Sequence, residues 1–233
     1  MNDRIEIEDL IIPITRKKIK NIHLSVNPPD GRVSISVPMS TRIDVLRAFV
    51  SSKLGWIRAK QIKIRSQLRE EPRQFVSRES HYIWGKRYLL KVKEENVRPN
   101  VYMDHKFIYL TIRPNSDYAI RHSVMYKWHK ELCSSFALEL IPKWERKLNV
   151  SVSKLFLQKM KTKWGSCNPA ARNIRLNTEL VSKPKDLFEY VLVHEMAHLL
   201  VPNHGADFVR ILDEFIPSWQ DLKMELNSYP LSN

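Results

Sequence analysis

The sequence predicts an α+β fold: an N-terminal antiparallel β-sheet with one long helix, followed by a compact region of helices and short strands. Three observations predict it. Apolar and polar residues alternate on both sides of an NPPDG turn near residue 30, and strand-forming residues return between residues 80 and 113. Later stretches instead repeat apolar residues every three or four positions, as helices do. The 233 residues, 43% of them hydrophobic, are enough to bury a core.

The first element expected is a hairpin, because apolar residues alternate at Ile22, Leu24 and Val26 and again at Val33, Ile35 and Val37. After Pro38, Ser40 or Thr41 can cap a helix that we expect to continue to about Arg69. Residues 80–113 then return to strand patterns and could extend the first sheet.

A second long helix is expected from Asp117 to about Lys147, and Pro142 should bend or divide it. We therefore predict a basic, β-rich N-terminal region over residues 1–116 and a second domain over residues 117–233. In the second domain, LFLQKMK and NIRLN are predicted strands on either side of a GSCNPAA turn. The following helix should begin near residue 184 and end at Pro202 and Asn203.

The net charge of +14 is concentrated in the first two thirds of the chain. Residues 151–233 hold ten Lys or Arg against nine Asp or Glu, which leaves +13 in residues 1–150. Residues 45–69 contain seven basic residues and no acidic one. Such a field attracts phosphates or acidic partners, so a nucleic acid or an acidic partner is one interpretation of the N-terminal region. The other is an ordinary solvated helix face.

The sequence also predicts the compartment. The first twenty residues lack the apolar core of a signal peptide, and no later window has eighteen uncharged apolar residues. Cys133 and Cys167 are too few for a disulfide framework. We expect a cytoplasmic protein that does not contact a membrane.

The stretch VLVHEMAHLLVPNHGADF, from Val191 to Phe208, contains an HExxH motif. On a helix, His194 and His198 lie one above the other and direct both imidazoles to one point, which predicts a metal site. Glu195 can reach a metal-bound water without binding the metal itself. Zinc lowers the pKa of its bound water to about 7, and a nearby carboxylate can take the proton as the water attacks a carbonyl. The motif therefore predicts zinc-dependent hydrolysis.

A third ligand is needed, because a catalytic zinc usually has three protein ligands and one open position. His204 is the preferred candidate, since the turn after the helix can bring it back to the metal. Its spacing equals that of the metzincins, but Val201 stands where those proteins carry glycine, which disfavours that group. A glutamate from a following helix is the alternative, with Glu214 preferred over Glu225.

The KTKWGSC stretch precedes the motif helix and could bind an extended peptide as an added strand, which makes Lys163 and Trp164 candidate substrate-binding residues. Alternatively, Trp164 packs under the sheet as an ordinary core aromatic. Hydrolysis also needs a donor near the developing oxyanion. Tyr190, Tyr229 and Lys163 are all candidates, and the sequence does not choose among them.

Two long runs, KMKTKWGSCNPAARNIRLNTEL and DLFEYVLVHEMAHLLVPNHGADFVRILDEFIPSW, closely resemble the YgjP-like metallopeptidase family, relatives of the SprT-like and WLM metallopeptidases. The resemblance is strong over residues 155–219 and weaker in the PMSTRIDVLRAFVSSKLGWI stretch. It implies a compact zincin-like domain with His194, His198 and His204 as zinc ligands and Glu195 as general base, the HExxH helix being the active-site helix. The family commonly has Arg at the position of Lys163 and an aromatic at that of Thr178, so contacts there can differ.

The leading functional hypothesis is a zinc metallopeptidase that hydrolyses peptide bonds in a protein or peptide substrate. One alternative is a nucleic-acid-associated binding protein in which the zinc is structural. A second alternative is a metal-dependent amide hydrolase acting on a non-protein substrate. Glu195 favours catalysis, because a purely structural zinc site would not require it.

Overall fold

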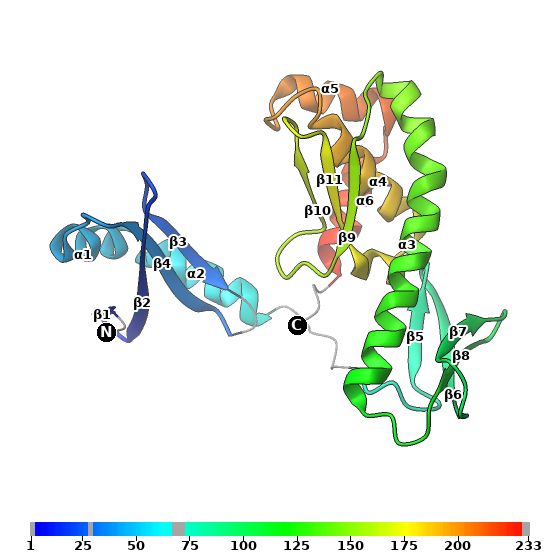
Figure 1. Ribbon diagram of the computed structural model, residues 1–233. Helices are drawn as coiled ribbons and strands as arrows, with labels where there is room; N and C mark the ends of the chain where they lie inside the picture. The colour runs from blue at the N-terminus through cyan, green and yellow to red at the C-terminus, as the bar shows by residue number, and fades with distance from the viewer. Residues whose placement is uncertain (1–2, 28–29, 67–72, 230–233) are drawn as a thin grey trace. The chain divides into compact units, whose positions relative to one another are not determined.

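The computed structural model describes residues 3–27, 30–66 and 73–229 (Figure 1). Tertiary contacts divide the chain into two compact units, Met1–Glu70 and Glu71–Ser232. Each unit has a hydrophobic core of its own, and we describe each by itself. The described part of the chain mixes helices with three small sheets, so the α+β class is correct.

The first unit is a four-stranded sheet with two helices. Its elements are β1 (Arg4–Ile7), β2 (Leu10–Lys17), β3 (His23–Asn27), β4 (Arg32–Pro38), α1 (Ile43–Ser52) and α2 (Leu54–Ser66). The strand order is β1-β2-β4-β3, with β2 and β4 parallel and both outer strands antiparallel to their neighbours. The expected hairpin is confirmed, because Val26 pairs with Val33 and Leu24 with Ile35 across β3 and β4.

Two features of this unit differ from expectation. The sheet is mixed rather than antiparallel, because β1 and β2 also belong to it; Pro13 inside β2 and the four-residue length of β1 hide both strands in the sequence. The single expected helix is two helices that meet at Lys53. Val50 in α1 and Ile57 in α2 are both fully buried in the core. The expected end at Arg69 lies outside the described residues.

The second unit begins with a sheet of the same topology. It comprises β5 (Ser80–Ile83), β6 (Lys86–Glu94), β7 (Asn100–Met103) and β8 (Phe107–Ile112). The order is β5-β6-β8-β7, again with a parallel inner pair and antiparallel outer strands. The expectation that these strands extend the first sheet is therefore wrong. The chain repeats one strand arrangement, although its sequence shows no matching repeat.

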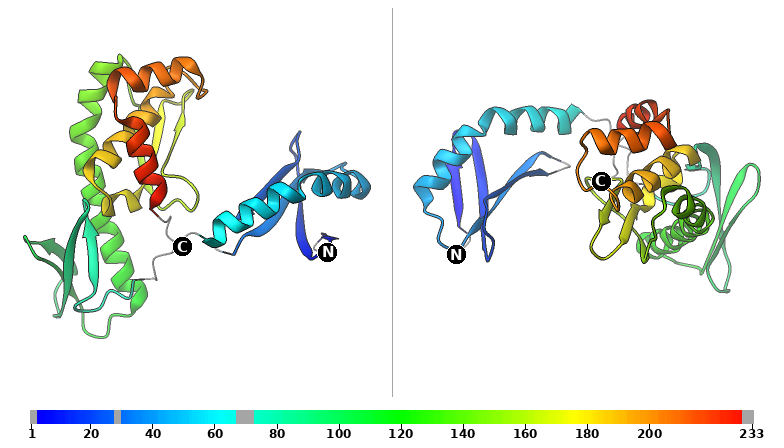
Figure 2. Two further views of the ribbon diagram at one scale, coloured as in Figure 1. Left: turned by 180° about the vertical axis from the view of Figure 1, so that it is seen from behind. Right: turned by 90° about the horizontal axis from the view of Figure 1, so that it is seen from above.

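Helix α3 (Tyr118–Leu148) follows this second sheet and matches the expected long helix. Asp117 caps it by accepting a hydrogen bond from the Ile120 amide. Pro142 lies inside α3 without dividing it. Figures 1 and 2 show that α3 runs past both sheets of the second unit. One cluster of buried residues extends from Phe75 to Leu226, so the second sheet shares its core with α3 and the elements that follow. The chain consequently divides near residue 70 instead of near residue 116.

The remaining elements surround the helix that carries the motif. They are β9 (Lys154–Gln158), β10 (Gly165–Asn168), β11 (Asn173–Asn177), a 3-10 helix (Thr178–Ser182), α4 (Lys185–Ala197), α5 (Ala206–Phe215) and α6 (Trp219–Ser228). The third sheet has the order β10-β11-β9, with β9 parallel and β10 antiparallel to β11. Strand β10 occupies part of the segment that the sequence assigned to a turn. No helix among the described residues is long and apolar enough to cross a membrane.

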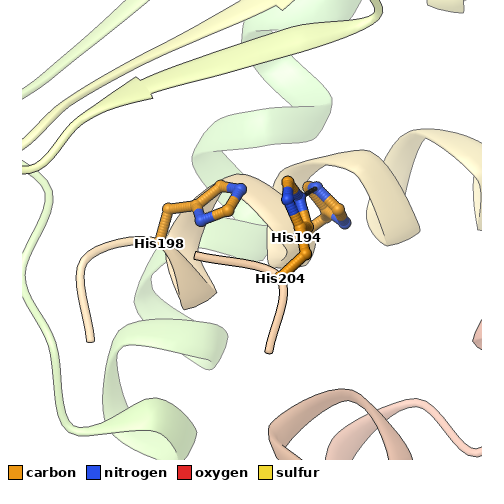
Figure 3. A group of neighbouring side chains, drawn as sticks. All are labelled: His194, His198 and His204. Atoms are coloured by element: carbon orange, nitrogen blue, oxygen red, sulfur yellow. Dashed lines mark hydrogen bonds between the residues drawn. The ribbon is translucent and has the colours of Figure 1, made fainter. Parts of the chain in front are cut away.

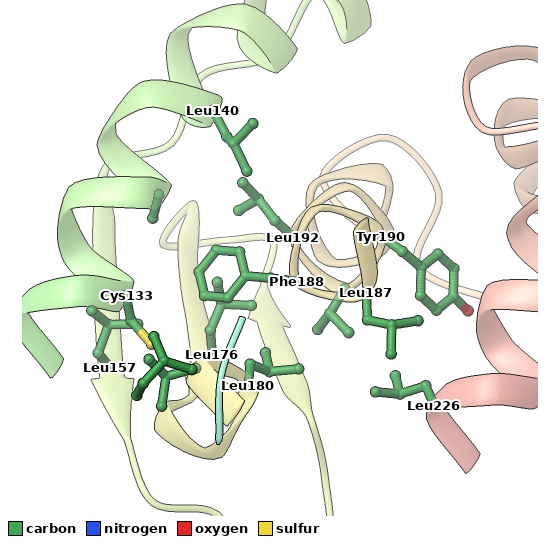
Figure 4. Packing of buried hydrophobic residues seen from close by; sticks show 14 of the residues in the cluster. Cys133, Leu140, Leu157, Leu176, Leu180, Leu187, Phe188, Tyr190, Leu192 and Leu226 are labelled. Atoms are coloured by element: carbon green, nitrogen blue, oxygen red, sulfur yellow. The ribbon is translucent and has the colours of Figure 1, made fainter. Parts of the chain in front are cut away.

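Helix α4 is the central element of this region, because it is buried on several sides. In Figure 4, Phe188 and Leu192 point toward α3, while Tyr190 points toward α6. Phe188 and Leu192 are fully buried, and Tyr190 is only 4% exposed. At roughly 25 cal/mol per Å² of apolar surface, each such side chain contributes on the order of 2 kcal/mol to stability. This packing fixes the last turn of α4, where the motif lies.

Candidate metal centre

The motif lies at the C-terminal end of α4 rather than in its middle. His194 and Glu195 occupy the last turn, and His198 is the C-terminal cap residue. The helix therefore ends before the expected stop at Pro202. The Leu200 and Val201 amides both donate to the Ala197 carbonyl, which closes the helix end in a tight turn. This turn leads the chain back toward α4 and brings His204 to the motif.

The structure brings His194, His198 and His204 together (Figure 3). One ring nitrogen of each lies within 4.8 Å of those of the other two, and the Nε2 atoms of His194 and His204 are 3.1 Å apart. Two nitrogens that bind one tetrahedral zinc at about 2.0–2.1 Å are separated by about 3.3 Å. The spacing of the cluster therefore suits a single metal ion.

Hydrogen bonding orients the His198 ring. Its Nδ1 lies 3.1 Å from the Val201 carbonyl oxygen. A carbonyl can only accept, so Nδ1 carries the proton and Nε2 keeps a lone pair for a metal. The Nδ1 atom of His194, in contrast, is buried and has no hydrogen-bond partner among the described residues.

Phe208 of α5 forms an apolar wall that touches all three histidine rings. Its ring centroid lies 4.9 Å from that of His194, 4.7 Å from His198 and 4.8 Å from His204. Phe208 is only 2% exposed. The sequence did not mark this residue, because it reads as an ordinary apolar position of the next helix.

Two of the three imidazoles have a lowered pKa. Burial lowers the pKa of His194 to about 4, and the neighbouring His198 and His204 act in the same direction. Burial also lowers the pKa of His204. Since a metal binds the neutral imidazole, the lowered pKa values of His194 and His204 favour metal binding by these two side chains at neutral pH.

Glu195 is the buried acid of the cluster, with 7% of its surface exposed. Burial raises its pKa to about 7, and the positive charge of Lys163 acts in the opposite direction. A carboxyl group whose pKa lies near the ambient pH can both accept and release a proton, as a general base must.

Gly165 at the start of β10 makes room for this carboxyl group. A Cβ atom at Gly165 would lie 2.7 Å from both Cγ and Oε1 of Glu195, closer than side-chain atoms approach one another. The sequence placed Gly165 in a turn, whereas the structure places it in a strand. A glycine inside a strand often marks a close backbone approach, and that signal could have revealed this role.

The two predicted substrate-binding residues directly precede β10. Lys163 is exposed, and its positive charge acts to lower the pKa of Glu195. Trp164 is partly buried and packs against the core of the second unit. Strand β10 is an edge strand of its sheet.

Burial raises the pKa of Cys167 to about 11, so this thiol stays protonated and is a poor nucleophile.

The remaining candidates are the alternative third metal ligands, Glu214 and Glu225, and the possible oxyanion donor Tyr190. Glu214 is exposed on α5 and outside the histidine cluster, and Glu225 is likewise exposed and outside it. Tyr190 lies near the cluster, with its ring centroid 5.9 Å from that of His194. Burial, with a further contribution from Glu195, raises the pKa of Tyr190 to about 12. Its hydroxyl therefore remains a hydrogen-bond donor at neutral pH.

Comparison with known proteins identifies the family. The family model described as YgjP-like, metallopeptidase domain, matches residues 20–229. The chain belongs to the YgjP-like metallopeptidase family. The match begins inside the first unit and extends through α6, so it includes the whole histidine cluster. The strong sequence resemblance noted above is thereby confirmed.

Two solved structures are similar to this YgjP-like chain over a minor part of its length. The metallopeptidase zymogen of Pyrococcus abyssi abylysin shares 17% identity, with a TM-score of 0.36, over 38% of this chain and 89% of that one. The metallopeptidase zymogen of Methanocaldococcus jannaschii jannalysin shares 21% identity, with a TM-score of 0.34, over 40% of this chain and 86% of that one. No curated protein matches the chain significantly.

Proposed function

We propose that this protein is a zinc-dependent metallopeptidase that hydrolyses peptide bonds in a protein or peptide substrate. One observation carries the proposal: three imidazoles converge within 4.8 Å, next to a buried carboxyl group whose pKa is raised to about 7. Membership of a metallopeptidase family supports the same reaction class.

In this proposal His194, His198 and His204 each hold the zinc through one ring nitrogen. The bound zinc would supply a Lewis acid that polarises the substrate carbonyl and makes water acidic. Glu195 accepts the proton of the attacking water and then delivers it to the leaving amine. The backbone at Gly165 leaves the carboxyl group the space that this role requires.

The substrate is proposed to bind beside β10. An edge strand has backbone groups that an extended peptide can pair with, and β10 passes directly against Glu195. Lys163 and Trp164 would then contact the peptide. Tyr190, protonated at neutral pH, is proposed as the donor that stabilises the oxyanion.

The test is the zinc content of the full chain purified without added metal. We expect about one zinc per chain, in keeping with a single three-ligand site, and loss of most of it in His204→Ala. The matched control is His23→Ala, which removes an exposed histidine on β3. Zinc retained in full by His204→Ala would move the third ligand to Glu214 or elsewhere. A wild-type chain that binds no zinc would overturn the proposal.

A further inference from the structure

The sheet β5–β8 has one face that the described residues of the second unit leave open. Its inner face packs against α3 and contributes Leu90, Ile108 and Leu110 to the core, each with 0% exposure. In Figures 1 and 2, no described helix of the second unit covers the opposite face. We call this opposite face the aromatic face. Its residues are Tyr82, Arg87, Leu89, Lys91, Lys93, Tyr102, Phe107 and Tyr109.

The strand register arranges these side chains in rows. Lys91, Tyr109 and Tyr102 are neighbours across β6, β8 and β7, and Phe107 lies one position earlier on the same side of β8. The rings of Tyr102 and Tyr109 stack at 4.7 Å between centroids, with 9° between their planes. The Lys91 Nζ lies 3.5 Å from the centroid of Phe107. Rings and cations therefore alternate over a short distance.

The rings are accessible and held in place. Tyr102 is 46% exposed and Tyr82 is 42% exposed. The Tyr109 hydroxyl donates to the Asp104 carboxylate, 2.9 Å away, which fixes the Tyr109 ring. Asp104 lies in the turn before β8, and its hydrogen bonds to the Lys106 and Phe107 amides lower its pKa to about 2. This carboxylate is thus already engaged by groups of its own turn.

The first sheet shows that this topology does not require such a surface. At corresponding positions on its outward side, β4 carries Ser34 and Ser36, and β2 carries Pro13 and Thr15. Cross-strand aromatic pairs can add stability to a sheet. The first sheet nevertheless forms with serine at the positions of Phe107 and Tyr109 and with threonine at that of Lys91, so sheet formation alone does not account for the rings of the aromatic face.

The chemistry of the aromatic face fits single-stranded nucleic acid. Neighbouring side chains on one face of a strand are about 6.6 Å apart, a spacing that an extended single strand can follow with successive bases. Bases stack on aromatic rings, and phosphates meet the adjacent lysines and arginines. An acidic peptide would use the cations but would leave the rings without a role.

We propose that the aromatic face binds single-stranded nucleic acid, with bases stacking on the exposed rings of Tyr102 and Tyr82 and phosphates pairing with Lys91 and Lys93. This surface differs from the basic stretch of residues 45–69 and does not depend on the proposed peptidase reaction. It gives the second unit a binding activity that is separate from its metal centre.

The experiment is fluorescence anisotropy of a labelled polyuridine oligonucleotide with the full chain, over a series of salt concentrations. Tyr102→Leu should weaken binding by about five-fold to a hundred-fold, the range measured for loss of one stacked base. The double variant K91Q/K93Q should weaken binding and reduce the slope of log affinity against log salt by about 1.4, since two phosphate contacts are lost. The matched control K130Q/K154Q removes the same charge from exposed positions on α3 and β9.

The proposal is supported if K91Q/K93Q weakens binding more than K130Q/K154Q and if Tyr102→Phe, which keeps the ring, restores the affinity that Tyr102→Leu loses. Tyr82→Leu provides a second ring variant should Tyr102→Leu fail to fold. Equal losses from the two lysine pairs would overturn it, because they would indicate unspecific attraction. Absence of binding would overturn it too. So would displacement of the oligonucleotide by polyglutamate combined with unchanged binding by both ring variants, since that pattern indicates an acidic polypeptide.

Discussion

The two four-stranded sheets of this chain have the same strand order but different surroundings. The first sheet forms a core with its own two helices, α1 and α2. The second sheet shares a core with everything that follows it, as far as Leu226 on α6. The same arrangement of strands thus serves in one case as a complete small unit and in the other as the base of a larger one.

Strand topology does not determine where the chemistry lies. The histidine cluster and Glu195 come from α4 and the turn after it, elements that only the second unit has. The outward faces differ as well, since the second sheet carries Phe107, Tyr109 and Lys91 where the first carries Ser34, Ser36 and Thr15. Substitutions in the two units should therefore have separable effects.

The largest separable effect is expected from Glu195→Gln. The amide keeps the size of the side chain but cannot accept the proton, so peptide cleavage should fall by about 10²–10⁴-fold while the zinc content stays unchanged. The matched control is Glu6→Gln, which makes the same change at an exposed position on β1 of the first sheet. Steady-state cleavage of a labelled protein substrate measures both. Equal activity in Glu195→Gln and wild type would contradict the assigned role.

The next effect concerns stability. Ile35 on β4 is 1% exposed, and truncation to alanine should destabilise the first unit by about 2–5 kcal/mol. Since the two cores are separate, the unfolding transition of the second unit should not move. Differential scanning calorimetry of wild type and Ile35→Ala would show this as a shift in one of two transitions. A single transition that shifts as a whole would mean that the units unfold together.

A smaller effect on activity is expected from Gly165→Ala. The added Cβ would lie 2.7 Å from the Glu195 carboxyl group, so that group has to shift. Displacing a catalytic group by a fraction of an ångström to one ångström lowers the rate by about 10-fold to 100-fold, whereas the zinc content expected from the proposed histidine ligands should not change. Peptide cleavage and zinc content, measured on the same preparation, separate the two effects.

Gly55→Ala is the control glycine in the first unit. Gly55 lies in α2, and a Cβ atom there meets no atom within 4 Å. Alanine should therefore leave activity unchanged and stabilise the first unit by up to about 1 kcal/mol. If Gly165→Ala were as active as Gly55→Ala, the close approach of β10 to Glu195 would have no part in catalysis.

Local rules explain which parts of this picture the sequence could predict. Helical periodicity places His194 and His198 on one face, and the turn after α4 makes His204 accessible to them, so all three could be named in advance. The hairpin of β3 and β4 follows from the alternation of apolar residues and from the NPPDG turn. Asp117 is recognisable as a cap because its side chain acts on the amide three residues later.

The features that were missed depend on contacts between distant segments. Phe208 reaches the histidines only because α5 folds back over α4, and Gly165 meets Glu195 only because β10 runs against that helix. The second sheet is separate from the first because its apolar side chains pack on α3. Periodicity shows that a strand has a buried face but not which element covers it, so the boundary expected near residue 116 differs from the division near residue 70.

The smallest expected effects are on stability, and they concern the N-terminal caps of the helices that follow the two sheets. The Asp117 side chain caps α3 by accepting a hydrogen bond from the Ile120 amide, whereas the Arg42 side chain makes no such bond at the start of α1. Asp117→Ala should lower the stability of the second unit by about 1 kcal/mol, because an amide at the helix start loses its partner.

Arg42→Ser should act in the opposite direction on the first unit. Arg42 has the extended backbone of a cap residue, with φ −75° and ψ 151°. A serine hydroxyl at this position can therefore accept a hydrogen bond from a backbone amide of the first turn, which has no side-chain partner at present. The gain is reduced by loss of the exposed Arg42–Asp44 ion pair, which contributes only a few tenths of a kcal/mol. Calorimetry should therefore show opposite shifts in two different transitions, and shifts of the same transition by both variants would show that the two units are not independent.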